Sequence, residues 1–250
     1  MEKETGKIEL KEKKIAIAPN GTRFVKVGIT GGIGSGKSTA GEYLKGKGYA
    51  VYDCDDIAKE LSERDDIKAQ LKKAFGESFF IEDRLDRRAL GSYVFKDKKR
   101  AEALNGIFFP AVIDKVKAIL EEKGDSESVF IVAPLLFEAK MEMLFHETWC
   151  IATSENIQKE RVRVRGGMTE EEMINRMGAQ LSFYERLDRV DRIINNNGSL
   201  EDFFAETEEI LKEALKVPLT VGDISGWKNV KAPNLLMPRH DEGDDDEDDE

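Results

Sequence analysis

The stretch that most constrains the fold is the glycine-rich segment from Gly31 to Ser38, which reads GGIGSGKS. An apolar, β-branched run, FVKVGIT (24–30), leads into it, and a helical pattern follows it. Glycines let the backbone adopt positive φ angles and turn its N–H groups inward around an anion. A helix that begins directly afterwards adds further N–H donors and the positive end of its dipole. Strand, turn and helix together match the phosphate-binding pattern G-x-x-x-x-G-K-[ST], called the P-loop below.

Four more short apolar runs predict buried strands, and helical patterns lie between them. They are YAVYD (49–53), VFIVA (129–133), TWCIA (148–152) and RIIN (192–195). This alternation predicts an α/β fold, an open five-stranded parallel sheet flanked by helices on both sides.

The remaining segments suggest how the chain is divided. Residues 1–23 form an N-terminal extension, either a hairpin that turns at Pro19–Gly21 or a poorly ordered segment. Residues 64–123 are almost wholly helical in pattern, with a long helix bent or interrupted near Pro110 and stopped by Gly124. We interpret them as an insertion that forms an acceptor site. Residues 217–250 are an irregular extension that ends in the acidic tail 241–250, which has the composition of a disordered segment.

Composition excludes several classes of protein. The chain has a net charge of −11, and residues 241–250 contribute −9 of it. The rest of the chain therefore carries only −2. We expect no basic surface for nucleic acid. The longest apolar run, 129–137, is far shorter than the ~20 residues of a membrane span, and the N-terminus shows no secretory signal. Cys54 and Cys150 make no disulfide or zinc framework, so we expect a cytoplasmic protein.

The P-loop by itself does not define the reaction, since GTPases, ATPases and small-molecule kinases share it. Lys37 is placed to reach the β- and γ-phosphates of ATP, and Ser38 offers its hydroxyl to Mg²⁺. The chain has no N-K-x-D motif for reading guanine; NNNG (195–198) is not one. The third predicted strand runs into VAPLLFE, where a proline interrupts the Asp–Glu layout of an ATPase. These observations favour a kinase.

Acidic residues follow the second predicted strand, in the segment YDCDD. Carboxylates at the carboxyl end of a parallel strand lie at the edge where such sheets bind ligands. Asp53 and Asp55, two residues apart, are expected to face the same side of an extended stretch. One can arrange Mg²⁺ through water, and the other can accept a proton from an attacking hydroxyl. The alternative is that Asp55 or Asp56 caps the helix that follows.

Beyond the P-loop, the chain resembles the dephospho-coenzyme A kinases over roughly residues 25–215. The resemblance rests on motifs in that family's order and spacing: GITGGIGSGKST, YDCDDIAKEL, LDRRALGSYVF, LNGIFFPAVI, VAPLLFE, KERVRVRGGMTEEE, RMGAQLS and IINNNG. Such enzymes transfer the γ-phosphate of ATP to the ribose 3′-hydroxyl of dephospho-coenzyme A. Their P-loop kinase fold has a five-stranded parallel sheet, a helical acceptor domain and a mobile lid.

The resemblance implies roles for individual residues of a kinase domain spanning 24–216. Asp55 becomes the base, and Lys37 acts on the phosphoryl group. Arg161 and Arg165 lie on the lid, residues 154–190, and close over that group. Asp53, Arg87, Asn105 and Phe109 fall in the motifs expected at the acceptor. The ATP-binding residues are Gly32, Ile33, Gly34, Ser35, Gly36, Lys37, Ser38 and Thr39.

One position departs from the family pattern. The family usually has a histidine directly before the proline of the long acceptor helix, and here Phe109 precedes Pro110. A polar contact to the acceptor is thereby lost or replaced by stacking. Two other functions stay open: another small-molecule P-loop kinase, of the nucleoside monophosphate or shikimate type, and a nucleotide-binding regulatory protein without turnover. The sequence also leaves the oligomeric state open, a homo-oligomer included.

Overall fold

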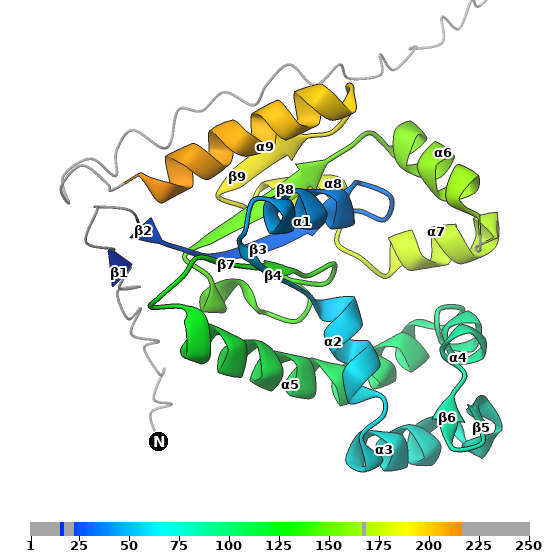
Figure 1. Ribbon diagram of the computed structural model, residues 1–250. Helices are drawn as coiled ribbons and strands as arrows, with labels where there is room; N and C mark the ends of the chain where they lie inside the picture. The colour runs from blue at the N-terminus through cyan, green and yellow to red at the C-terminus, as the bar shows by residue number, and fades with distance from the viewer. Residues whose placement is uncertain (1–15, 18–22, 167–168, 217–250) are drawn as a thin grey trace, which may run out of the picture. The chain divides into compact units, whose positions relative to one another are not determined.

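The computed structural model describes residues 16–17, 23–166 and 169–216, which belong to the first of the two units into which the chain divides, Met1–Val217. At the centre of this unit is a five-stranded parallel sheet (Figure 1). The strands stand in the order β4 (Ala50–Asp53), β7 (Val129–Val132), β3 (Lys26–Gly31), β8 (Glu147–Ala152) and β9 (Arg192–Asn195). The predicted strands and their parallel arrangement are confirmed.

The strand order places the P-loop in the middle of the sheet. β3 is the central strand, and its Ile29 stands opposite Val132 of β7 and Trp149 of β8. The chain leaves β3 for β4, two positions away, and returns later to place β7 between them. Ligands of open α/β sheets bind at the carboxyl ends of the strands where such a reversal occurs.

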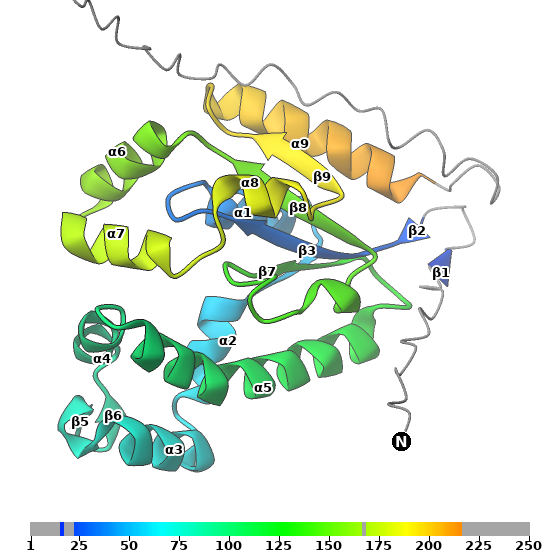
Figure 2. The same ribbon diagram turned by 180° about the vertical axis from the view of Figure 1, so that it is seen from behind.

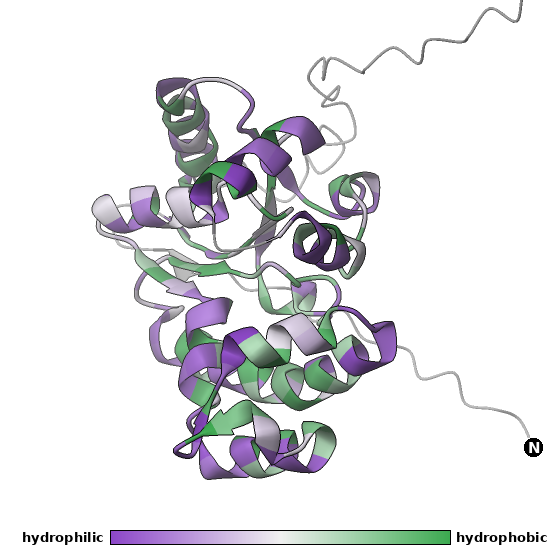
Figure 3. Cartoon of the chain, turned by 90° about the vertical axis from the view of Figure 1, so that its right-hand side faces the viewer, coloured by the Kyte–Doolittle hydropathy of each residue, from purple (hydrophilic) through white to green (hydrophobic). Residues whose placement is uncertain are grey.

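Each face of the sheet is covered by helices, as predicted. On one face, α1 (Lys37–Gly46) and α9 (Leu200–Leu215) pack on residues such as Ile29 and Trp149. On the other, α2 (Cys54–Leu61) and α5 (Lys98–Lys123) pack on residues such as Ile131. Figures 1 and 2 show α9 and α5 on opposite sides of the sheet, and Figure 3 shows apolar strands between helices with hydrophilic outer faces.

The expectation of an almost wholly helical segment over 64–123 is wrong in one place. After α3 (Asp65–Phe75) and the short 3₁₀ helix η1 (Glu77–Phe79), strands β5 (Phe80–Ile81) and β6 (Arg84–Leu85) form a hairpin. Its turn residues, Glu82 and Asp83, have φ angles of 48° and 61°. Hairpin turns with positive φ favour Asn and Gly, so this turn carries no sequence signal. Lys68 and Lys72 bind the Asp83 carboxylate at 3.1 and 2.9 Å.

The long helix α5 continues through Pro110 without interruption, and it ends at Gly124 as predicted. Proline removes the hydrogen bond to the carbonyl four residues earlier, which here belongs to Gly106. Both residues are exposed, so water can replace the missing donor. Val112 and Val116 are buried in the core on the opposite side of the helix and hold it in place.

The described residues between 154 and 190, which leave out 167–168, form three helices, α6 (Glu155–Arg165), α7 (Glu170–Gly178) and α8 (Phe183–Leu187). A capping box between Thr169 and Glu172 starts α7. A second capping box, between Ser182 and Glu185, starts α8 and separates it from α7. α7 lies against α4 (Arg87–Val94), where the Ser92 hydroxyl donates to the Glu172 carboxylate at 2.6 Å.

The N-terminal hairpin is supported by the antiparallel pairing of β1 (Ala16–Ile17) with β2 (Arg23–Phe24). Its turn and the rest of the extension lie outside the described residues, as do residues 217–250 and the acidic tail.

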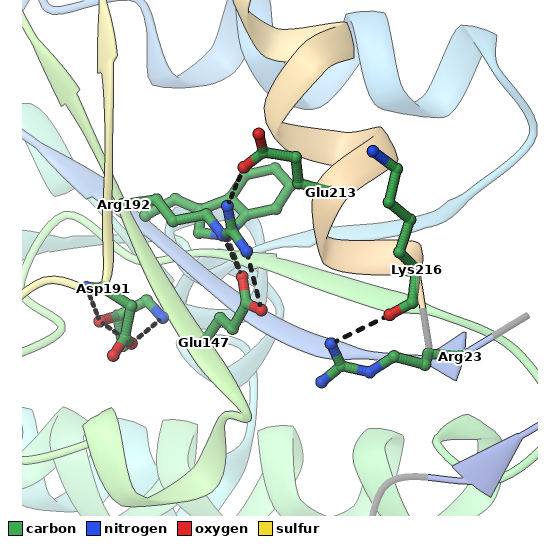
Figure 4. A network of polar contacts seen from close by, with 8 residues as sticks. Arg23, Glu147, Asp191, Arg192, Glu213 and Lys216 are labelled. Atoms are coloured by element: carbon green, nitrogen blue, oxygen red, sulfur yellow. Dashed lines mark hydrogen bonds and ion pairs between the residues drawn. The ribbon is translucent and has the colours of Figure 1, made fainter. Parts of the chain in front are cut away.

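A network of ion pairs ties the last strands to α9 (Figure 4). Arg192, whose side chain is 9% exposed, binds Glu147 at 2.6 Å and Glu213 at 2.7 Å. Because Glu147 and Arg192 begin β8 and β9, the network lies at the amino ends of the strands. It therefore stabilises the sheet at the amino ends of its strands, opposite the end that carries the P-loop.

Candidate active site

The P-loop connects the carboxyl end of β3 to the amino end of α1. Gly34 and Gly36 have φ angles of 70° and 102°, in the left-handed region that glycine adopts without strain. A Cβ at Gly34 would also lie 2.8 Å from the carbonyl oxygen of Gln158 in α6. Within the described residues, no side chain caps α1 and no acidic residue stands in its first turn. Its first N–H groups therefore remain available to an anion.

Side chains distant in sequence hold the P-loop at the carbonyl of Ser35. Asn196 donates to this oxygen at 2.7 Å, Thr153 at 3.0 Å and Arg161 at 3.5 Å. No motif in the sequence predicts these roles of Asn196 and Thr153. Asn196 belongs to the NNNG segment (195–198), and a polar run directly after a buried strand is a usable signal for a contact of this kind. These contacts fix the loop from outside, so its inner surface is left for phosphate.

Lys37 folds back over the P-loop. Its ammonium donates to the carbonyl oxygens of Gly31 and Gly32 at 2.9 and 2.8 Å. Burial lowers its pKa to about 8, and the nearby carboxylate of Asp55 opposes this effect. The cation is thus held in a poorly hydrated place where a phosphate oxygen would be a strong partner.

Asp53 and Asp55 lie at the carboxyl end of β4, but the expected geometry is wrong. β4 ends at Asp53 and α2 begins at Cys54, so the two residues do not share an extended stretch. Asp53 caps α2 by accepting the N–H of Asp55 at 2.8 Å, and it is Asp53, not Asp55 or Asp56, that takes the capping role. Burial raises the pKa of the Asp53 carboxyl. Asp55 stands exposed in the first turn of α2, with its charge acting on Lys37.

The two predicted lid arginines have different surroundings. Arg161 is half-buried against the P-loop and also donates to the carbonyl and the side-chain oxygen of Asn196, at 3.1 and 3.2 Å. Arg165 is exposed in the last turn of α6. Arg163, between them, forms an ion pair with Glu160 at 2.8 Å. The structure therefore brings Arg161 to the P-loop but not Arg165.

The residues expected at the acceptor lie on α4 and α5. Arg87 is exposed at the start of α4, and Asn105 is half-buried in α5. Neither caps a helix, because Asp86 and Asp97 cap α4 and α5. Phe109 stands one turn after Asn105 on the same side of α5 and packs, half-buried, against the core under α2 and α5.

Ser38 and Thr39 are exposed at the start of α1. Within the described part of the chain, no group of three or more His, Cys, Asp or Glu side chains is arranged to hold a metal ion. In the same residues, no helix combines the length and the apolar character that crossing a membrane requires.

The fold and the site define a class. A parallel sheet with a P-loop after its central strand, and acidic residues after the strand that follows in sequence, is the arrangement of a P-loop kinase. A family model described as "Dephospho-CoA kinase" matches residues 25–202. The chain belongs to the dephospho-CoA kinase family and is therefore a kinase of coenzyme A biosynthesis. This membership supports dephospho-coenzyme A as the acceptor and gives no support to the two alternatives left open by the sequence.

Relatives and solved structures agree. A dephospho-CoA kinase of Fusobacterium nucleatum is 37% identical over 183 residues, 73% of this chain and 94% of that protein. One from Thermus thermophilus is 38% identical over 189 residues, 75% and 90% of the two chains. A crystal structure of a Thermus thermophilus protein has a TM-score of 0.64 at 36% identity, covering 76% of this chain and 97% of that one. Dephospho-CoA kinase from Campylobacter jejuni has a TM-score of 0.56 at 25% identity, covering 76% and 96%.

Proposed function

We propose that this chain transfers the γ-phosphate of ATP to the ribose 3′-hydroxyl of dephospho-coenzyme A, with Asp55 as base and Lys37 on the phosphoryl group. The observation that carries the assignment is the position of Asp55, exposed in the first turn of α2 directly after the carboxyl end of β4, with its charge acting on Lys37 of the P-loop. The acceptor oxygen forms a bond to the γ-phosphorus, and its proton passes to Asp55. The bond from that phosphorus to the bridging oxygen breaks, and its electron pair leaves with ADP.

ATP binds along residues Gly32–Thr39 in this proposal. The first N–H groups of α1 and the ammonium of Lys37 face the phosphates. The Ser38 hydroxyl is an oxygen ligand of the kind that Mg²⁺ takes together with phosphate oxygens and waters, so the residues present fit that ion. When bound, Mg²⁺ neutralises charge on the phosphates. Asp53, two residues before Asp55, would orient waters around a bound Mg²⁺ in this proposal.

The acceptor binds over the helical segment 64–123 in this proposal, with Arg87, Asn105 and Phe109 along its surface. Residues 154–190 act as the lid, and Arg161 is the lid residue that contacts the P-loop. The hydrogen bond between Ser92 and Glu172 supports this assignment, because it brings the lid helix α7 against the acceptor segment. Both cysteines are buried and free, consistent with a reducing cytoplasm.

Purified protein with ATP and Mg²⁺, offered dephospho-coenzyme A, AMP or shikimate, tests the proposed acceptor. We expect ADP formation at least about 10²-fold faster with dephospho-coenzyme A, because a site built around one acceptor leaves polar groups unpaired with another. Comparable rates with AMP or shikimate would contradict the proposal. ADP formation independent of any acceptor would indicate an ATPase.

ATP binding should weaken as the pH rises above 8. Burial lowers the pKa of Lys37 to about 8 in the free protein, and bound phosphate favours the charged ammonium, so binding above this pH must take up a proton. We expect the affinity to fall by close to tenfold per pH unit, about 1.4 kcal/mol, between pH 9 and the pKa of the complex. Calorimetry in buffers of different ionisation enthalpy measures the proton uptake. Lys37→Arg, which stays charged, should remove the pH dependence; an affinity that is flat in the native protein would show that Lys37 does not contact phosphate.

Phe109→His tests the departure from the family pattern. Because Phe109 is half-buried against the core, we expect the variant to lose about 1–2 kcal/mol of stability. If its exposed edge also faces the acceptor, the KM for dephospho-coenzyme A should change several-fold and that for ATP by less than about twofold. Phe108→His, on the neighbouring side of α5, is the matched control and should change stability without this preference. Equal changes in both KM values would reject a role for Phe109 at the acceptor.

A further inference from the structure

Arg186 is a buried cation that no motif indicated. It lies in α8 with 5% of its surface exposed. Its Nη1 donates to the side-chain oxygen of Gln180 at 3.3 Å. Its Nε is buried, and within the described residues nothing accepts a hydrogen bond from it. An arginine carries five N–H donors and does not lose its charge in proteins, so a buried one with an unused donor needs a partner.

The surroundings of Arg186 do not supply that partner. Burial lowers the pKa of Arg186, whereas the nearby Cys150 and Glu138 raise it by a smaller amount. The Glu138 carboxylate accepts the N–H of Leu181 at 2.6 Å, and the hydrogen bond that Arg186 makes within the described residues goes to the Gln180 amide, not to a carboxylate. Cys150 is itself buried, which raises the pKa of its thiol to about 11, so it is neutral at physiological pH. The arginine is therefore a desolvated charge without an anion.

Arg186 lies in the helix that packs on β8, the strand next to β3 and its P-loop. Its charge and that of Lys37 both act on Cys150, and the charge of Arg186 also lowers the pKa of Lys37, after the larger effect of burial. Cys150 of β8 stands opposite Thr30 of β3, the residue directly before the P-loop. The Thr30 hydroxyl is likewise buried without a partner in the described chain. Arg186 and Lys37 are thus near enough for their charges to repel, beside the strands that lead to the P-loop, and an anion between them would stabilise both.

We propose that Arg186 is a further catalytic residue, which binds the γ-phosphoryl group of ATP together with Lys37 as that group moves to the acceptor. The inference rests on the proposed function and assigns to the same site a residue outside the P-loop and outside the lid helix α6. The planar guanidinium can donate two hydrogen bonds to oxygens of one phosphoryl group. Charge spreads over these oxygens in the transition state, so Arg186 stabilises that state more than the bound nucleotide.

The test compares Arg186→Gln and Arg186→Lys with Arg189→Gln, an exposed arginine just after the same helix. We expect Arg186→Gln to lower kcat by about 10²–10³-fold, and Arg186→Lys to regain at least about tenfold of it. Without acceptor, Arg186→Gln should weaken ATP binding by about tenfold or more and leave ADP binding within about twofold, because ADP lacks the contacted group. Arg189→Gln should behave like the native protein.

Thermal unfolding of each variant separates this role from a structural one. Equal losses in ATP and ADP affinity, with a lowered unfolding temperature in both Arg186 variants, would make Arg186 a structural residue and overturn the proposal. So would a kcat within threefold of native, or weakened binding of dephospho-coenzyme A with ATP binding unchanged. If the native protein failed to phosphorylate dephospho-coenzyme A, the proposed function would fall, while the ATP and ADP comparison, which needs no acceptor, would still judge Arg186.

Discussion

Lys37→Ala should abolish detectable phosphoryl transfer, a loss of at least about 10³-fold in kcat, and leave the fold intact. The Lys37 ammonium donates hydrogen bonds to the carbonyl oxygens of Gly31 and Gly32, in the loop proposed to hold the phosphates. Its charge offsets the charge that develops on the moving phosphoryl group. Near-native turnover in this variant would show that the P-loop does not hold the reacting phosphate.

A matched variant separates the charge from the fold. Burial lowers the pKa of Lys37, which means that its environment disfavours the charged form, so removing it should not destabilise the protein. Lys45→Ala, on an exposed position of the same helix, should change neither activity nor unfolding temperature. A drop in the unfolding temperature of Lys37→Ala larger than that of Lys45→Ala would assign the lysine to structure.

Asp55→Asn should lower turnover by about 10²–10⁴-fold, the usual contribution of a positioned general base. Asparagine keeps the shape of aspartate but cannot take the proton of the acceptor hydroxyl. ATP affinity should change little or increase, since a negative charge near the phosphates is removed. Asp56→Asn is the control, because Asp56 is also exposed in the same turn of α2. Turnover above about half of native in Asp55→Asn would mean that no base is needed at this position.

The sheet and the P-loop could be predicted from sequence because their signals are local. Strands buried on both faces are short apolar runs, and the turn between β3 and α1 needs glycine at Gly34 and Gly36. The hairpin at Glu82 and Asp83 escaped prediction because these residues adopt positive φ without the usual Asn-Gly pair. The sequence suggested Asp55 or Asp56 as the cap of α2, whereas Asp53 caps it. The difference arises because three aspartates follow closely and the sequence does not mark the residue at which β4 ends.

The parts of the site that escaped prediction depend on contacts between distant residues. The Ser35 carbonyl is held by Asn196, 161 positions along the chain, through a fold that the local pattern does not encode. Arg186 stands in a polar segment that reads as solvated surface, and its burial follows from the packing of α8 on β8. Arg161 and Arg165 look equivalent in sequence, yet the first contacts the P-loop and the second is exposed.

The central claim is that the phosphoryl group goes to the ribose 3′-hydroxyl of dephospho-coenzyme A, and the position of the new phosphate tests it most directly. Phosphorus NMR of the product, with a 3′-deoxy analogue of the acceptor as control, distinguishes the possible positions. We expect one phosphate monoester on the 3′-oxygen, formed at the rate of ADP release, and no product from the analogue. A phosphate on the 2′-oxygen, or phosphorylation of the 3′-deoxy analogue, would contradict the account.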